Sequence, residues 1–526
     1  MKDKADNKKF YITTPIYYAS GDLHIGHCCT SLYADCVARF KRLEGYDVCF
    51  LTGADEHGQK VEEKAKAQGL TAQQFVDALD INYKKLWSVL GISYDKYIRT
   101  TDKVHVEVVQ KIYEKLFEQG DIYKGKYEGW YCTPCESFFT EAQLVDGKCP
   151  DCHREVHLME EESYFFKLSK YQKRLEEYYE QNPNFITLDS TRNEMLNSFI
   201  RPGLQDLCVS RTTFSWGVPL TFDKKHVSYV WIDALANYLS ALGYQTEDDQ
   251  LFKEFWPADL HFMAKEIVRF HVIIWPILLM ALNLPLPKKC HAHGWITASG
   301  GQKMSKSLGN GIDPFVLSER YSADALRYYI YSEGPIMRDS VYSTEGFLNA
   351  INNDLCNNLG NLLSRTTAMI VQNFGDEFTL QFDDRKDIDN ALIEHVLNLP
   401  SVLRGHMEKL EINHAIHAIM QVADKANKYI EDATPWNFKE DKQRISTILS
   451  VLHFSLQSIA ISLKAFLPQT ASRIAADLGF DIENLHLDEI NENILSSKIK
   501  YNVQKNVPLF PRLKIQEELN YLNDVK

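Results

Sequence analysis

The chain has 526 residues, of which 45% are hydrophobic and 25% are charged, and its 58 basic residues are outnumbered by 71 acidic ones. This length is too great for one hydrophobic core and predicts about three or four domains. The net charge of -13 argues against a polycationic nucleic-acid coat. Nucleic acid is not excluded as a class of partner, because local basic clusters can still bind phosphates.

Neither the start of the chain nor its apolar run at residues 271–287 predicts a membrane segment. That run is interrupted by Pro276 and Pro285 and is shorter than the roughly 20 residues that span a bilayer. The first ten residues are charged and contain no apolar signal region. We therefore expect a cytoplasmic protein without a membrane contact, in which the 11 cysteines are reduced thiols or metal ligands.

The first hundred or so residues show alternating strand and helix patterns. Apolar, β-rich runs at residues 10–18 and 46–52 alternate with helical patterns at residues 30–43 and 71–90. Such alternation is typical of βα units on a parallel sheet. We predict that residues 1–117 form the first half of a split, Rossmann-like α/β core.

A histidine cassette, His24-Ile25-Gly26-His27, follows the first strand-like run. Its imidazoles are placed between a strand end and a helix N-terminus, where open α/β sheets bind anionic ligands. His24 and His27 are three residues apart, so they share one helix face and can both donate to phosphate oxygens. Gly26 has no side chain, so an adenine ring could lie close to the backbone there. The alternative reading is simply two histidines at a helix start.

Residues 118–225 interrupt the βα alternation and contain two paired cysteine motifs. Cys132-Thr133-Pro134-Cys135 is followed, after thirteen residues, by Cys149-Pro150-Asp151-Cys152. Two such knuckles predict a closed tetrahedral thiolate site for one structural Zn²⁺ per chain. Reduced buried cysteines are the alternative, but they do not explain the pairing. We therefore predict an insertion with zinc knuckles.

Residues 226–325 resume the sheet pattern and complete the core. Strand character returns at residues 228–231, and strand-like runs at residues 260–263 and 290–296 each lie next to a helical pattern. A second cassette, Lys303-Met304-Ser305-Lys306-Ser307, follows in a glycine-flanked loop. Its lysines are point charges for a polyphosphate and its serines are donors, although such loops are often solvated turns. The usual phosphate-loop and dinucleotide motifs do not occur in the sequence.

Beyond about residue 322 the apolar periodicity is helical, in residues 324–331, 349–374, 388–409 and 412–431. This predicts an all-α bundle. We assign residues 326–360 to a linker and residues 361–526 to the bundle and tail. Asn361 and Arg365 share a helix face and suit hydrogen bonding to unstacked bases, while Trp436 offers a stacking plane. A surface pair and a capped core tryptophan are the alternatives.

Together the two cassettes resemble the signature sequences of class I aminoacyl-tRNA synthetases, and both match without substitution. The resemblance implies that a substrate carboxylate attacks the α-phosphate of ATP, with Mg²⁺ on the phosphates, and that the aminoacyl group is then transferred to tRNA. Such chemistry depends on positioning and charge stabilisation rather than on an enzymic nucleophile. The resemblance assigns catalysis to His24, His27, Lys303 and Lys306, and ATP binding to these residues with Gly26, Glu266 and Ser305.

Four further segments resemble the methionyl-tRNA synthetases within this class. They are Pro15-Ile16-Tyr17-Tyr18-Ala19, Gly53-Ala54-Asp55-Glu56-His57-Gly58, Tyr229-Val230-Trp231-Ile232-Asp233-Ala234 and Ala264-Lys265-Glu266-Ile267-Val268-Arg269-Phe270-His271. The resemblance implies L-methionine as substrate, Asp55 on its ammonium group, and a side-chain pocket of Ile16, Tyr18, Trp231, Tyr238, Ile267 and His271. Aromatic edges suit a polarizable thioether. Read alone, the apolar members are ordinary core residues, and Asp55 is a candidate helix cap.

The sequence departs from this family in one segment. Methionyl-tRNA synthetases usually have Gly-Lys-Asp where this chain has Ala264-Lys265-Glu266, so the acid expected near the ATP ribose is longer by one methylene. The resemblance also implies that Asn361, Arg365 and Trp436 bind the anticodon of tRNA(Met), and that residues 326–360 contact its stem.

Two features bear on specificity and assembly. The insertion is too small for the editing domain of related enzymes for branched amino acids, which favours methionine. The sequence also has no C-terminal tRNA-binding domain of the kind that some members use to dimerise, so we expect a monomer.

Two rival functions come from other classes. A small-molecule nucleotidyltransferase could use the histidine cassette, but it would not need the helical region or the second cassette. A non-catalytic, zinc-bearing RNA-binding protein would have no reason to keep both phosphate cassettes. Another class I synthetase is the nearest competitor. Pyrophosphate exchange with each amino acid distinguishes all of these.

Overall fold

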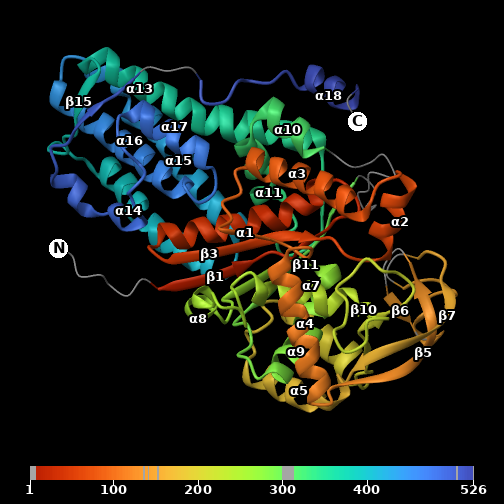
Figure 1. Ribbon diagram of the computed structural model, residues 1–526. Coiled ribbons are helices and arrows are strands. Elements are labelled where there is room, and N and C mark those ends of the chain that lie inside the picture. Colours follow the sequence, from red (N-terminus) through yellow and green to blue (C-terminus); the bar gives the residue numbers. More distant parts are fainter. Residues whose placement is uncertain are drawn as a thin grey trace.

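The computed structural model describes residues 8–133, 137–139, 141–150, 153–298, 313–504 and 508–524. Figure 1 shows an α/β core in the middle of the molecule, a smaller β-rich region on one side of it and a bundle of helices on the other. The mixed α/β class, the parallel sheet and the helical C-terminal region predicted from the sequence are confirmed.

The core is built on a six-stranded sheet whose strands pair in parallel. Its order is β12-β11-β1-β3-β2, with β4 beside β3. The strands are β1 (Lys9–Thr13), β2 (Tyr17–Tyr18), β3 (Asp47–Asp55), β4 (Lys96–Arg99), β11 (Leu260–Ala264) and β12 (Cys290–His293). The chain leaves β1 toward β3 and later returns through β11 on the other side. The carboxyl end of β1 is therefore a switch point, where open α/β sheets bind ligands.

Helices pack on both faces of this sheet (Figure 1). The first to follow a strand is α1 (Ile25–Leu43), which buries most of its residues. The helix α3 (Ala72–Leu90) begins with a capping box of Thr71 and Gln74 and ends at Gly91 in the left-handed conformation. Both helices agree with the predicted patterns. The remaining core helices are α2 (Gln59–Ala67), α4 (Lys103–Glu118), α7 (Val230–Ser240), α8 (Gln250–Phe255) and α9 (Trp275–Leu282).

The β-rich region follows α4 and contains a four-stranded antiparallel sheet. Its order is β6-β5-β7-β8, with β5 (Ile122–Cys132), β6 (Ser137–Phe139), β7 (His157–Phe166) and β8 (Leu207–Cys208). The long ladder runs from Ile122 opposite Phe166 to Tyr131 opposite His157. The short helices α5 (Gln172–Gln181) and α6 (Asp189–Glu194) come between β7 and β8 in the chain. This separate sheet lies between the two halves of the core in sequence.

One predicted strand is wrong. Residues 228–231 do not return to the central sheet, because β10 (Val227–Ser228) pairs with β9 (Ser210–Arg211), and α7 begins at Val230. The aromatic and β-branched residues there fit either state, but the following run of alanine and leucine favours a helix. Among the described residues, the second half of the core therefore contributes β11 and β12 to the central sheet.

The C-terminal half is helical. It begins with α10 (Pro314–Tyr321) and α11 (Ala323–Glu333), and continues through α12 (Thr344–Ala350) and the π-type segment Ile351–Gly360 into α13 (Asn361–Phe374). The bundle comprises α13, α14 (Asp387–Glu408), α15 (Ile412–Ala433), α16 (Lys442–Leu463) and α17 (Pro468–Leu478). The final helix, α18 (Ile515–Asp524), returns to α10, where Arg320 and Tyr321 bond Glu518 (Figure 1).

Helix α16 is the one described helix that is long and apolar enough to cross a bilayer. Its uncharged run, residues 445–463, is longer than the apolar run at residues 271–287. However, 94% of its apolar window is buried inside the protein. A core helix of a bundle passes the same test, so this helix is weak evidence for a membrane span.

A buried ion pair joins the core to the bundle. Arg327 of α11 is fully buried and bonds the carboxylate of Asp35 in α1. The same guanidinium donates to the carbonyl of Leu90 at 2.9 Å and to that of Phe466 at 2.9 Å. Burial alone would raise the pKa of Asp35, but the charges of Arg327 and Arg39 outweigh it and lower this pKa to about 2. One side chain thus ties together three distant segments.

Candidate active site

The histidine cassette lies at the carboxyl edge of the central sheet. His24 is the N-cap of α1 and His27 occupies the third helical position, so the two rings form a reciprocal capping box. The ring centroids are 4.0 Å apart. The positive end of the helix dipole and the two imidazoles therefore lie together at the switch point of the sheet.

Hydrogen bonds fix the tautomer of each imidazole. The backbone N–H of Gly26 donates to Nδ1 of His24 at 3.1 Å, and the backbone N–H of His24 donates to Nδ1 of His27 at 3.1 Å. Because each Nδ1 accepts, the proton of each neutral ring is on Nε2. Both histidines then present an Nε2–H donor, which is what binding to a phosphate oxygen requires.

The structure gives a second reason for a glycine at position 26, in addition to the close approach of an adenine ring predicted from the sequence. A Cβ built on Gly26 would lie 2.9 Å from Cε1 and 3.0 Å from Nδ1 of His24. A side chain would therefore displace the His24 ring. In this structure the His24 imidazole occupies the space where a side chain of residue 26 would lie.

The residues predicted to form the methionine pocket pack largely in one apolar cluster. Ile16, Trp231, Tyr238 and Ile267 belong to it, and Trp231 stacks on Phe270 with an interplanar angle of 7°. The hydroxyl of Tyr238 is 2.7 Å from Nε2 of His271. The structure thus brings together the segment between β1 and β2, helix α7, and the short helical segments Lys265–Ile267 and Phe270–Ile274 that precede α9.

His271, which contacts Tyr238, is a neutral ring. Its Nδ1 is 2.9 Å from the carbonyl oxygen of Ile267, which can only accept. Nδ1 therefore carries the proton, Nε2 accepts, and Tyr238 donates to it. Burial lowers the pKa of His271 to about 4, so this ring is uncharged at neutral pH.

Tyr18 and Asp55 lie opposite each other at the end of the sheet. Tyr18 of β2 is the register partner of Asp55, the last residue of β3. Asp55 is 6% exposed. The alternative reading of Asp55 as a helix cap is wrong, because the N-cap of α2 is Gly58. Tyr18 packs against a different apolar cluster from the other pocket residues.

Glu266 contacts Trp295, for which the sequence predicted no role. Its Oε2 accepts from Nε1 of Trp295 at 2.6 Å, just past the ends of β11 and β12. The neighbouring Lys265 lies 4.3 Å from the centroid of the Trp295 ring and pairs with Asp339 at 2.7 Å. In this structure the carboxylate of Glu266 is therefore bonded to the indole of Trp295.

A buried histidine–aspartate network next to this site was missed from the sequence. Asp233 Oδ2 is 2.7 Å from Nδ1 of His57, and its Oδ1 is 2.8 Å from Nε2 of His105. Although burial favours the neutral acid, interactions with these two rings lower the pKa of Asp233 to about 2. Two of the three residues lie in segments that resemble the family, but no spacing in the sequence shows that they meet.

Two of the four predicted zinc ligands lie within the described residues. Cys132 and Cys149 are fully buried and share a small cluster with Phe139. The backbone N–H of Cys149 donates to the carbonyl of Arg154, and that of His153 donates to the carbonyl of Cys149. Cys135 and Cys152 lie outside the described residues. Two buried thiols in one cluster, one at the end of β5 and the other 17 residues later in the chain, fit a soft, thiolate-binding cation.

The other predicted residues divide into two groups. The lysine cassette, with Lys303, Ser305 and Lys306, lies outside the described residues. Asn361 is exposed at the start of α13, and Arg365 one turn later pairs with Glu431 of α15 at 2.6 Å. Trp436 is 47% exposed just beyond the end of α15. Arg365 and Trp436 therefore both lie near the C-terminal end of α15.

Comparison with known proteins decides the family. The family model described as "tRNA synthetases class I (M)" matches residues 10–158 and 154–367. A methionine–tRNA ligase of Clostridium acetobutylicum is 50% identical over 525 residues, which are 99% of this chain and 81% of that protein. The chain belongs to the methionyl-tRNA synthetase family.

Further members of this family agree with the assignment. The methionine–tRNA ligase of Bacillus subtilis is 48% identical over 98% of this chain and 80% of its own length. The structure of Mycobacterium tuberculosis methionyl-tRNA synthetase in complex with methionyl-adenylate has a TM-score of 0.91 and 37% identity, and the match covers 96% of this chain and all of that one. A second family model, "Anticodon-binding domain of tRNA ligase", matches residues 391–523.

Proposed function

We propose that the chain activates L-methionine with ATP to give methionyl-adenylate and pyrophosphate, and then transfers methionine to tRNA(Met). The observation that carries this proposal is the imidazole pair at the switch point of the sheet, in a chain about half identical to methionine–tRNA ligases over nearly its whole length. The rival classes, a nucleotidyltransferase and a non-catalytic RNA-binding protein, do not account for that match.

Activation joins a methionine carboxylate oxygen to the α-phosphorus of ATP, and the bond from that phosphorus to the pyrophosphate oxygen breaks. The attacking carboxylate is already ionised, so no enzymic base is needed, and the rate depends on orientation and charge stabilisation. The Nε2–H groups of His24 and His27 donate to phosphate oxygens. Lys303, Ser305 and Lys306 bind the polyphosphate from the other side, and Gly26 and Glu266 complete the ATP site. Mg²⁺ bound with ATP supplies further charge neutralisation.

Methionine would lie between β1, β3 and α7. The carboxylate of Asp55 pairs with the substrate ammonium group. The thioether lies against aromatic and apolar side chains and the neutral Tyr238–His271 pair, which suits a soft, weakly accepting sulfur. The residues of this pocket are Ile16, Tyr18, Trp231, Tyr238, Ile267 and His271.

Cys132, Cys135, Cys149 and Cys152 hold one structural Zn²⁺ in the insertion, residues 118–225. Buried Cys132 and Cys149 support this proposal. Atomic absorption on protein purified without added metal should report about one zinc per chain, and a report of none would refute it.

The helical region recognises tRNA. Asn361, Arg365 and Trp436 bind the anticodon from the bundle of residues 361–526, and residues 326–360 link it to the core halves, residues 1–117 and 226–325. The match of residues 391–523 to an anticodon-binding family supports this division. A monomeric state and a cytoplasmic location stay predictions.

The proposal is tested by replacing one phosphate donor. His27→Asn should lower the rate of methionine-dependent ATP–pyrophosphate exchange by roughly 10²–10³-fold, because one donor to the developing charge is lost. The exposed His157→Asn in the insertion serves as a matched control and should exchange at the wild-type rate. Unchanged exchange in His27→Asn would contradict the assigned role.

A further inference from the structure

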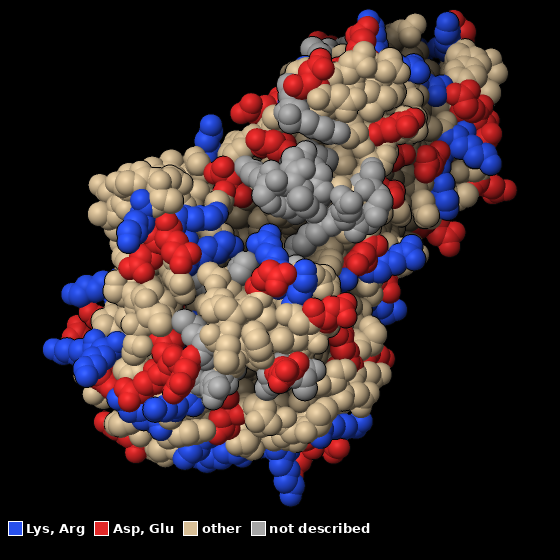
Figure 2. Space-filling model, turned by 90° about the vertical axis from the view of Figure 1, so that its right-hand side faces the viewer, with Lys and Arg blue, Asp and Glu red and all other residues tan. Residues whose placement is uncertain are grey.

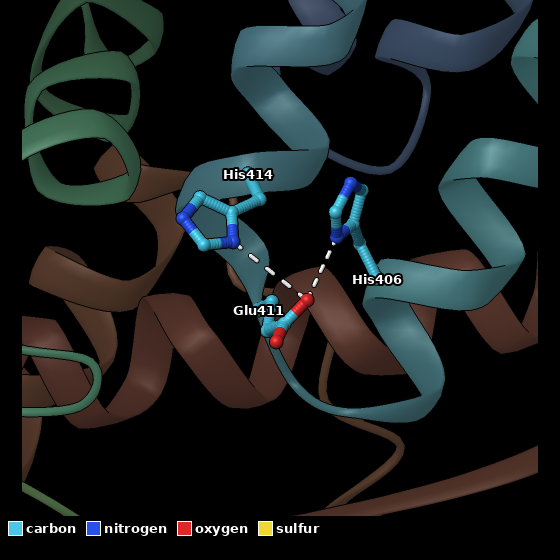
Figure 3. A group of neighbouring side chains, drawn as sticks. All are labelled: His406, Glu411 and His414. Atoms are coloured by element: carbon cyan, nitrogen blue, oxygen red, sulfur yellow. Dashed lines mark hydrogen bonds and ion pairs between the residues drawn. The ribbon is translucent and has the colours of Figure 1, made fainter.

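Two imidazoles and one carboxylate converge at the turn between α14 and α15, far from the proposed active-site residues in sequence (Figure 3). His406 lies in the last turn of α14, Glu411 is the N-cap of α15, and His414 lies in the first turn of α15. The nearest nitrogen and oxygen atoms of the three side chains lie within 4.8 Å of one another. Among the described residues this is the one group of three potential metal ligands with that spacing.

Both rings face the same carboxylate oxygen. Nδ1 of His406 is 2.7 Å and Nδ1 of His414 is 3.7 Å from Oε2 of Glu411. Figure 3 shows the two rings side by side above this oxygen, each carried by a different helix. The three side chains thus point toward one another across the turn.

We infer that His406, Glu411 and His414 bind a first-row divalent cation, with Zn²⁺ as the best match. Two imidazoles and one carboxylate form a donor set that suits Zn²⁺, Co²⁺ or Ni²⁺, and three protein ligands leave a fourth position for water. In a tetrahedral site with bonds near 2.1 Å the ligand atoms lie about 3.4 Å apart. The pair at 2.7 Å has to open slightly and His414 has to move closer.

The surroundings allow this adjustment. The side chains of His406, Glu411 and His414 are 31%, 25% and 57% exposed, so they can rotate without disturbing the core.

A simpler reading is a hydrogen-bonded helix cap without metal. An imidazole near the end of α14 and a carboxylate at the start of α15 both suit the helix dipoles. That reading explains His406 and Glu411, but it does not require His414. Its Nδ1 lies beyond hydrogen-bond distance from Glu411 yet within reach of a shared ion. The second imidazole is therefore the observation that favours a metal site.

A cation bound here would join the end of α14 to the start of α15. Its ligands bracket the turn at Leu410, which has a positive φ of 59°. Nearby Arg404 of α14 pairs with Glu44 at 3.0 Å and with Asp488 at 2.6 Å, so this end of the bundle touches the end of α1. Metal binding to the folded state alone would stabilise this junction.

Cobalt titration of the full-length protein, purified with its own zinc retained, tests the inference. Wild type should bind one Co²⁺ equivalent saturably, with visible ligand-field bands but without the sulfur-to-cobalt charge-transfer band that thiolate ligands give. His414→Ala and Glu411→Gln should each weaken this binding at least about tenfold. His417→Ala, one turn further along α15 and outside the group, is the matched control and should bind as wild type does.

A thermal scan gives a second readout. Added Zn²⁺ should raise the unfolding midpoint of wild type and of His417→Ala, but not that of His414→Ala. Identical titrations for wild type and His414→Ala, or cobalt spectra that show thiolate ligands only, would overturn the inference. Because His414 is largely exposed, its replacement should leave folding and methionine-dependent exchange intact, so failure here is distinguishable from failure of the proposed function.

Discussion

Single buried polar residues determine the chemistry of the proposed methionine pocket. The hydrogen bond from His271 to the carbonyl of Ile267 fixes the tautomer, and the tautomer in turn fixes the direction of the hydrogen bond from Tyr238. The pocket wall is therefore polar but uncharged, which allows an apolar thioether to be bound without burying an unpaired ion. The family resemblance predicted the identity of these residues, but only the structure shows which atom donates.

Tyr238→Phe tests this hydrogen bond. The change leaves the buried Nε2 acceptor of His271 without its donor, at a cost of about 1–3 kcal/mol. We expect the KM for methionine in pyrophosphate exchange to rise about tenfold or more. Tyr244→Phe is the matched control, since Tyr244 is buried nearby but bonds only Gln245 among the described residues. Equal KM values for wild type and Tyr238→Phe would contradict the assigned role.

Buried histidines should make the protein sensitive to mild acid. Burial lowers the pKa of His271, His291 and His453 to about 4, whereas an unfolded chain protonates its histidines near about 6.5. Below about pH 6.5 the unfolded state binds protons that the folded state does not, so stability is full above that pH and is lost progressively toward pH 4.

The thermal midpoint, measured from pH 7.5 to 4.5, should therefore fall most steeply below pH 6.5. His453→Gln should make the decline shallower, by at most about 1.4 kcal/mol per pH unit. The exposed His157→Gln is the control and should follow wild type. A midpoint that stays flat down to pH 4.5 would show that the histidines are not held neutral.

At the scale of elements, long periodic segments were predictable and short ones were not. The helices α3, α14 and α15 lie where the apolar pattern places them, because a repeated apolar face fixes a helix through packing. The strand predicted at residues 228–231 was wrong, because four residues with mixed propensity do not determine which strand they pair with. The apolar run of α16 is visible in the sequence. Its burial, which identifies it as a core helix, comes only from the structure.

Trp436→Ala tests the role assigned to the end of α15. The indole is 47% exposed and packs little, so its loss should cost little stability. Loss of a stacking plane is worth about 1–3 kcal/mol per base, so kcat/KM for tRNA(Met) charging should fall roughly tenfold to a hundredfold. Methionine-dependent exchange, measured in parallel without tRNA, should stay near the wild-type rate. Equal losses in both assays would reject the anticodon assignment.

The whole molecule depends on contacts that no local pattern reveals. Arg327 and Asp35 are 292 residues apart, yet they form a buried pair that also engages the ends of α3 and α16. The sequence predicted the three regions of the chain, but it could not show where they touch. The surface charge does not mark a binding face either, because basic and acidic side chains are interspersed over the described part of the face in Figure 2.

Arg327→Met tests the importance of this junction. The substitution leaves the carboxylate of Asp35 buried with only part of its compensating charge, and we expect the free energy of unfolding to fall by about 3–5 kcal/mol. Arg320→Gln, which breaks a partly exposed pair with Glu518, should cost about 1 kcal/mol or less. Thermal unfolding of the two variants gives the comparison. Similar midpoints would show that the buried pair does not hold the core to the bundle.

ATP–pyrophosphate exchange with each of the twenty amino acids tests whether this molecule activates methionine. Exchange with methionine should be far above that with every other amino acid. Exchange with no amino acid, or with another amino acid in preference to methionine, would contradict this expectation.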